Sequence, residues 1–237
     1  MTVHYDNRLY RVAFTLGVLA LTGMLIAPYM ALVYADVEKE MELAQKIFYF
    51  HVPSAYAMYA GFFLVFVFSI LYLWRRNPLW DIWASCSAEV GLLFCTVVLL
   101  SGSLWAKPIW GAWWVWDPQL TLVLVLWLIF VAYLMLLSYA ENPLQSAKFR
   151  AVLGILGFLD APLIHYSVEL WRAHHPKIVR AEEIALPPDM LYAWLFCSVT
   201  FLVLFGAILT KRVSVERARH ELAALKAEIQ DLEVSST

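Results

Sequence analysis

The sequence predicts an all-α integral membrane protein, a bundle of six membrane-spanning helices with both termini in the cytoplasm. Hydrophobic residues make up 62% of the 237 positions, charged residues only 15%, and the mean hydropathy is +0.69. Ordinary soluble domains are about half apolar and about one-quarter charged. Several apolar runs approach the ~20 residues that cross a hydrocarbon core of about 30 Å. Helices are expected because backbone groups in lipid must pair within their own segment.

The apolar runs predict the order of the spans along the chain. They cover residues 12–34, 55–74, 89–104, 119–137, 149–165 and 190–209. The third and fifth runs are short for a complete crossing, so the boundaries drawn for them are approximate. The first run is longer than the roughly 7–15 apolar residues of a signal-peptide core, and we interpret it as an uncleaved anchor.

The distribution of Lys and Arg predicts the orientation, because cytoplasmic loops carry the excess of positive charge. Of the 17 Lys and Arg residues, 11 lie on the side shared by the two termini and the connectors after spans two and four, and 6 lie on the other side. Both termini are therefore predicted to be cytoplasmic. The connectors after spans one, three and five are predicted to face outward.

The three cysteines indicate no redox chemistry. Cys86, Cys95 and Cys197 lie in or beside predicted spans and form no CxxC pair. A disulfide framework, a thiol-redox motif and covalent c-type haem attachment are therefore disfavoured. We interpret these residues as small members of the core.

Histidine and tryptophan side chains are concentrated in the outward-facing connectors. The first connector ends in FYFHVPSAY, immediately before span two, and the second reads KPIWGAWWVWDPQLT over residues 107–121. The third follows IHYSVELWRAHHPKI. The candidate residues in chain order are His51, Trp110, Gly111, Trp113, Trp114, Trp116, Asp117, His165, Glu169, Arg172, His174 and His175.

These features also have purely structural interpretations. Tryptophan is enriched where a membrane protein crosses the membrane–water interface. Asp117 followed by Pro118 is a natural N-cap and first turn for span four. A single interfacial histidine is more often structural than a ligand. Taken one by one, the residues leave an aromatic belt and a ligand platform both open.

The coincidence on one face favours a planar metal-containing ligand. Two imidazoles from separate connectors provide axial nitrogens for an iron, and indole rings provide flat apolar surface for a macrocycle. A closed zinc site needs four compact nitrogen or sulfur donors, and no cysteine lies on the predicted outer face. Haem therefore fits these residues better than zinc.

Three motifs resemble a known family. WGAWWVWDPQLT resembles the tryptophan-rich WWD signature of the haem-handling membrane proteins of cytochrome c biogenesis. FHVPSA and IHYSVELW, together with six spans and this length, resemble the CcmC family in particular. The resemblance covers residues 8–209, and larger WWD relatives with more spans fit less well.

The resemblance implies a haem-delivery function at the periplasmic face of the bacterial inner membrane. CcmC-like proteins hold b-type haem non-covalently with two axial histidines and a WWD segment, here about residues 105–119. They pass it to the haem chaperone CcmE during c-type cytochrome maturation, and work with CcmA, CcmB and CcmD in a CcmABCD complex. By the same resemblance the axial ligands fall on His51 and His175, while His165 is a pocket or structural residue.

The chain departs from the family pattern after the WWD aspartate. Relatives commonly have Ala-Arg there, and this chain has Pro118 and Gln119. If that arginine pairs a haem propionate in relatives, Lys107 and Arg172 are the nearest substitutes by sequence. The imidazoles also need orienting hydrogen-bond acceptors, and Asp117, Glu169 and Ser54 are the candidates on this side.

The chain divides into a membrane domain, residues 1–212, and a tail, residues 213–237. In the tail, Leu222, Leu225, Ile229 and Leu232 are spaced three to four apart with charges between them. This spacing predicts an amphipathic cytoplasmic helix. We interpret it as a surface for the transporter subunits.

Other function classes are less well supported. A haem-transporting permease needs polar residues along its spans, and the spans offer only Glu89 and Asp160. A quinone-linked redox cytochrome usually places its ligand histidines within the spans, whereas His51 and His175 are expected in connectors. No catalytic motif predicts an enzyme. The net charge of −2 and acidic outer loop predict no nucleic-acid partner, so membrane lipid and the Ccm proteins are the expected partners.

Overall fold

The computed structural model describes residues 7–39, 41–139, 143–170 and 186–235, and these residues form helices without any β-strand. The elements are α1 (Asn7–Tyr29), the π-helix η1 (Met30–Tyr34), the 3₁₀-helix η2 (Leu43–Ile47), α2 (Phe48–Arg75), α3 (Pro78–Trp110), α4 (Pro118–Tyr139), α5 (Pro143–Phe158), α6 (Asp160–Leu170) and α7 (Pro188–Ser235). The all-α prediction is confirmed.

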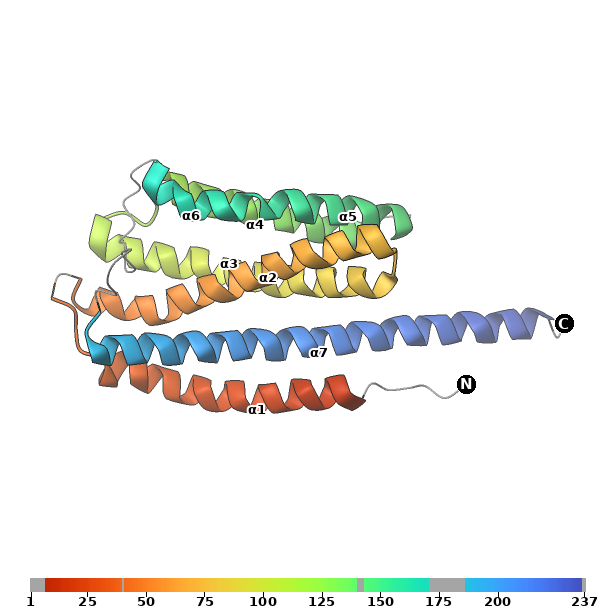
Figure 1. Ribbon diagram of the computed structural model, residues 1–237, viewed down its shortest axis with the longest axis horizontal. Helices are drawn as coiled ribbons and strands as arrows, with labels where there is room; N and C mark the ends of the chain where they lie inside the picture. Colours follow the sequence, from red (N-terminus) through yellow and green to blue (C-terminus); the bar gives the residue numbers. More distant parts are fainter. Residues whose placement is uncertain (1–6, 40, 140–142, 171–185, 236–237) are drawn as a thin grey trace.

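The helices form an elongated bundle with both termini at the same end (Figure 1). Five segments are long and apolar enough to cross a membrane: Arg8–Tyr34, Leu43–Arg75, Pro78–Trp110, Pro118–Leu137 and Pro188–Val234. The chain is therefore a multi-pass membrane protein. The third predicted span is much longer than its apolar run, because α3 begins at Pro78, next to the N-cap Asn77.

The fifth predicted span is divided between two short helices. α5 and α6 follow one another along the bundle, with a turn at Leu159 between them (Figure 1). Pro162 explains the interruption, since proline has no N–H to donate to the carbonyl of Phe158 and its ring crowds that turn. Neither helix alone has the length of a full crossing, so the described residues contain five candidate spans where the sequence predicted six.

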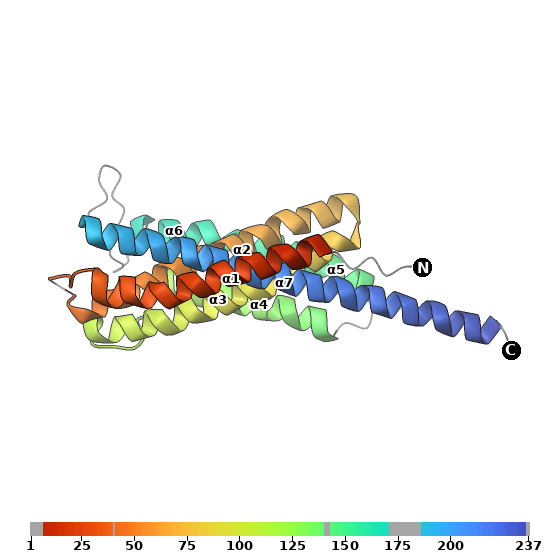
Figure 2. The same cartoon turned by 90° about the horizontal axis from the view of Figure 1, so that it is seen from below.

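The last helix, α7, continues without a break from the bundle into the predicted tail and projects beyond the other helices (Figure 2). The predicted membrane domain and tail thus share one helix. Leu222, Ile229 and Leu232 on the projecting part are 53%, 55% and 63% exposed.

Close backbone contact joins α2 and α3 at the centre of the bundle. A Cβ atom built on Gly61 would lie 2.7 Å from Gly91 Cα, so the two backbones meet where neither residue has a side chain. Phe62 stacks on Phe130 of α4 at a centroid distance of 3.9 Å. Small residues allow this approach in membranes, where dispersion contacts drive helix association. Cys86, Cys95 and Cys197 are buried and unbridged, as predicted.

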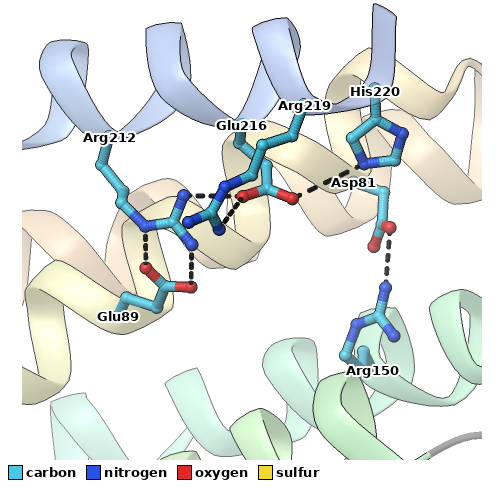
Figure 3. A network of polar contacts seen from close by, with 7 residues as sticks. All are labelled: Asp81, Glu89, Arg150, Arg212, Glu216, Arg219 and His220. Carbon is cyan, nitrogen blue, oxygen red and sulfur yellow. Dashed lines mark hydrogen bonds and ion pairs between the residues drawn. The ribbon is translucent and has the colours of Figure 1, made fainter. Parts of the chain in front are cut away.

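Ion pairs connect helices at the end of the bundle that carries the termini (Figure 3). Arg212 of α7 donates to both carboxylate oxygens of Glu89 in α3 and to Glu216 at 2.7 Å. Arg150 of α5 donates to Asp81 of α3 at 2.7 Å. Charges in membrane proteins are commonly neutralised in this way. Glu89, which the sequence suggested as a polar residue within a span, is therefore engaged by Arg212.

Candidate functional site

A cavity of about 180 Å³ lies where α2 begins, α3 ends and α4 begins. These helix ends are at the end of the bundle opposite to the termini (Figure 1). Most of its lining is apolar. The polar and aromatic lining residues are His51, Tyr59, Ser103, Trp105, Trp110, Trp114 and Gln119. The fold thus brings the histidine before span two together with half of the indole rings of the WWD connector.

His51 is held in a defined orientation by α3. Its Nδ1 lies 2.9 Å from Ser101 Oγ, and the Ser101 hydroxyl donates to the carbonyl of Val97 at 2.6 Å. Because the hydroxyl proton is used on Val97, the Ser101 oxygen accepts from His51 Nδ1–H. A neutral imidazole that donates from Nδ1 keeps its lone pair on Nε2. In this tautomer Nε2 is the ring nitrogen that can accept a hydrogen bond or bind a metal.

Glycine makes room for this imidazole on the opposing helix. A Cβ atom at Gly102 would lie 3.2 Å from His51 Cε1 and 3.7 Å from Nδ1. Trp105, one turn further along α3, packs edge-on against the imidazole at a centroid distance of 5.6 Å. Ser101, Gly102 and Trp105 were not among the residues singled out from the sequence, although all three belong to the stretch SGSLW, whose last residue begins the predicted WWD segment.

The prediction that His51 lies in a connector is wrong. Helix α2 begins at Phe48, directly after η2, so His51 lies within its first turn and is only 8% exposed. The partner that the structure shows for Nδ1 of His51 is Ser101 rather than Ser54, whose hydroxyl donates to the carbonyl of Phe50 at 2.7 Å. The first connector is therefore shorter than its polar residues suggested.

The four tryptophans of the WWD connector separate into two pairs. Trp110 and Trp114 line the cavity beside His51. Trp113 and Trp116 are 57% and 76% exposed. Trp114 and Trp116 meet edge-on at 5.7 Å, so the inward and outward pairs are in contact. One connector thus presents indole surface both to the cavity and to its surroundings.

Two capping residues shape this connector. Gly111 ends α3 with a φ of 74°, a left-handed conformation that glycine adopts without strain, and its N–H donates to the carbonyl of Lys107. Asp117 is 4% exposed and caps α4, because its Oδ1 accepts from the N–H groups of Gln119 and Leu120 at 2.8 and 3.2 Å. Asp117 therefore has the helix-capping role that the sequence suggested for it.

Lys107 is engaged by the connector itself. Its Nζ donates to the carbonyl of Gly111 at 2.9 Å and lies 5.9 Å from the centre of the Trp113 ring. These contacts stabilise the turn after α3. They also place the ammonium group on the side of the outward-facing indole rather than at the cavity wall.

Several polar atoms around the cavity have no protein partner. Within the described residues, Trp105 Nε1, Trp114 Nε1 and Gln119 Oε1 are buried and make no hydrogen bond. Unsatisfied buried polar groups are costly, and in native proteins they often mark the position of a missing ligand or water. The cavity therefore fits an apolar ligand that also carries polar groups.

Comparison with known proteins decides the family. The model of the family described as heme exporter protein C matches residues 4–228. This chain belongs to that family. Heme exporter protein C of Bradyrhizobium diazoefficiens is 32% identical over 183 residues, 76% of this chain and 70% of the relative. The proteins of that name from Paracoccus denitrificans and Escherichia coli are 32% and 28% identical, over 77% and 76% of this chain and 77% and 73% of the relatives.

Membership of the heme exporter protein C family confirms the resemblance drawn from the WWD and histidine motifs. The cavity contains only part of the predicted site. His165 of α6 is exposed and meets the Tyr166 ring edge-on at 5.3 Å, while its neighbour Ile164 lines the cavity instead. His175, His174 and Arg172 lie outside the described residues, as does the side chain of Glu169.

Proposed function

We propose that this chain binds haem at the periplasmic face of the bacterial inner membrane and delivers it to the haem chaperone CcmE for c-type cytochrome maturation. It would act beside CcmA, CcmB and CcmD, with exposed leucines on the projecting part of α7 as a contact surface for them. The observation that carries the proposal is the oriented His51 imidazole in an indole-lined cavity, in a chain whose relatives are named heme exporter protein C.

In this proposal haem is the cargo, held non-covalently by two axial histidines. His51 supplies one nitrogen, Nε2, because Ser101 holds Nδ1. His175, the second ligand implied by the family pattern, comes from the connector before α7. Trp110 and Trp114 contact the macrocycle, and the N–H groups of Trp105 and Trp114 are donors for its carboxylates.

The size of the cavity sets how haem enters. Pockets for drug-sized ligands measure about 300–1,000 Å³, and this cavity holds about 180 Å³. Haem binding therefore requires the WWD connector to move outward from the ends of α3 and α4. Residues 111–117 are not helical, so no helix has to break for this movement. The exposed rings of Trp113 and Trp116 then offer the chaperone a contact beside the cargo.

One observation favours a second candidate function. His51 lies within a membrane helix, the placement that we associated with quinone-linked redox cytochromes, in which haem stays bound and only electrons move. Delivery and electron transfer are distinguished by adding haem-free CcmE to the haem-loaded protein. We expect haem to pass to the chaperone, and retention of all haem by this chain would favour the redox function.

The visible absorption spectrum of the detergent-purified chain tests the ligand assignment. We expect a low-spin haem spectrum that His51→Ala and His175→Ala abolish or convert, because each removes an axial nitrogen. His165→Ala and His174→Ala are matched controls and should keep the wild-type spectrum. If all four variants absorb alike, or if only His165→Ala loses haem, the proposed iron site is wrong.

Ser101→Ala tests the orientation of His51. Loss of the Nδ1 acceptor should weaken haem binding by about 10- to 100-fold, the usual effect of removing a partner that orients a metal ligand. Ser103→Ala is the matched control, since Ser103 also lines the cavity but donates to the carbonyl of Leu99. Haem titration of both variants measures the difference, and equal affinities would show that Ser101 does not position the ligand.

A further inference from the structure

A groove lies between α1 and α7, at the end of the bundle that carries the termini. It has a volume of about 830 Å³ and is mainly apolar. Ala13, Gly17 and Leu21 line it from α1, and Leu204 and Ala207 line it from α7. No part of the proposed haem site contributes to it, so the groove needs a separate explanation.

The groove results from how α1 packs on α7. The two helices are in close contact at Gly23, where an added Cβ would lie 2.7 Å from Thr200 Cγ2. At Gly17, closer to the N-terminus, an added Cβ would meet no atom within 4 Å. Space therefore remains beside Gly17, and this residue lines the groove.

Positive charge is gathered at that end of the groove. Lys211, Arg212 and Arg219 line it. Arg212 is engaged by Glu89 and Glu216 (Figure 3). Lys211 makes no ion pair within the described residues and lies 4.8 Å from the centre of the Tyr10 ring, while Arg219 is 67% exposed and reaches Glu216 only at 3.4 Å. Lys211 and Arg219 thus remain available to an anion.

We infer that this groove binds an anionic phospholipid, with an acyl chain beside Ala13, Gly17 and Ala207 and the phosphate near Lys211 and Arg219. The groove follows α1 from Tyr10 to Met24, roughly 20 Å at 1.5 Å per residue. One leaflet contributes about half of the ~30 Å hydrocarbon core. A groove of this length therefore accommodates one acyl chain, and the cations lie at the depth of the headgroup.

The charge arrangement favours lipid over a partner's transmembrane helix. A membrane helix packs along its whole length through apolar and small residues and needs no cations at one end. Basic pockets between membrane helices on the cytoplasmic side are suited to acidic headgroups. The Lys and Arg distribution predicts that this end is cytoplasmic, which agrees with a lipid from the anionic inner leaflet.

Native mass spectrometry of the full-length chain tests the inference. The protein is reconstituted in vesicles of equal parts phosphatidylglycerol and phosphatidylcholine and then extracted in mild detergent. We expect wild type to retain phosphatidylglycerol in preference to phosphatidylcholine. In the double variant Lys211→Gln and Arg219→Gln, the ratio of retained phosphatidylglycerol to phosphatidylcholine should fall at least about fivefold, since each basic residue contributes to binding. Gly17→Leu, which fills the groove, should reduce retention of both lipids.

Two matched controls separate this site from general effects. Lys39→Gln removes an exposed cation elsewhere in the chain, and Thr15→Leu adds bulk to an exposed position of α1 outside the groove. Both should bind lipid as wild type does. Equal retention of the two lipids by wild type, or unchanged retention in the groove variants, would overturn the inference. The latter is the result expected if a partner protein's helix occupies the groove.

Discussion

Gly102→Leu is expected to abolish most haem binding while leaving every candidate iron ligand in place. The glycine faces the imidazole of His51, and a Cβ there already lies 3.2 Å from Cε1. A leucine adds three further carbon atoms toward the ring and the cavity. Overpacking of this kind costs about 1–3 kcal/mol, which corresponds to a roughly 5- to 150-fold loss of affinity.

The measurement is haem content after purification, followed by titration of the haem-free protein. Gly17→Leu is the matched control, because it makes the same exchange at a helical glycine remote from the cavity. It should keep wild-type haem content. A Gly102→Leu protein that binds haem normally would place the macrocycle away from His51, and the indole-lined cavity would then be a packing feature only.

Gly61→Ala should strongly destabilise the bundle, although alanine is the better helix former. The added Cβ would lie 2.7 Å from Gly91 Cα and 3.1 Å from Gly91 N, which are backbone atoms that cannot rotate away. Helices α2 and α3 must separate, and the expected net loss is about 1–3 kcal/mol. Separation also disturbs the contact between His51 of α2 and Ser101 of α3, so haem affinity should fall too.

Gly17→Ala provides the reference for that experiment. Its Cβ would meet no atom within 4 Å, so only the helix propensity changes, with an expected gain of about 0.5–1 kcal/mol. Both variants are purified in mild detergent and titrated with a denaturing detergent. Circular dichroism monitors the loss of helix, and the unfolding midpoints give the difference in stability. Equal stability of Gly61→Ala and wild type would mean that α2 and α3 can move apart at little cost.

The site shows where interpretation of the sequence reached its limit. His51 and the WWD motif were recognisable because each belongs to a short local sequence motif. Asp117 followed by Pro118 correctly predicted the start of α4. The candidate orienting partners were Ser54, Asp117 and Glu169, because these residues are close in sequence or on the same predicted face. The observed partner, Ser101, lies 50 positions away and within a helix.

The division of the fifth span was also difficult to foresee. Its apolar run continues through Asp160 and Pro162, and hydropathy averages over such single residues. A proline in an apolar run is tolerated in some membrane helices, where neighbouring groups satisfy the freed carbonyl. Here the chain makes a turn at Leu159, and α6 starts again at Asp160.

By itself, the sequence determined the all-α, multi-pass membrane fold, the family, and the start of α4 at Asp117 and Pro118. These follow from hydropathy, capping residues and local motifs, which depend on neighbouring positions. Only the tertiary structure decided that Ser101 orients His51, that Trp110 and Trp114 rather than Trp113 and Trp116 face the cavity, and that Arg212 neutralises Glu89. The physical reason is that contacts between helices depend on how closely their backbones pack, as at Gly61 and Gly91. The periodicity of apolar residues within one helix does not specify which helix packs against it.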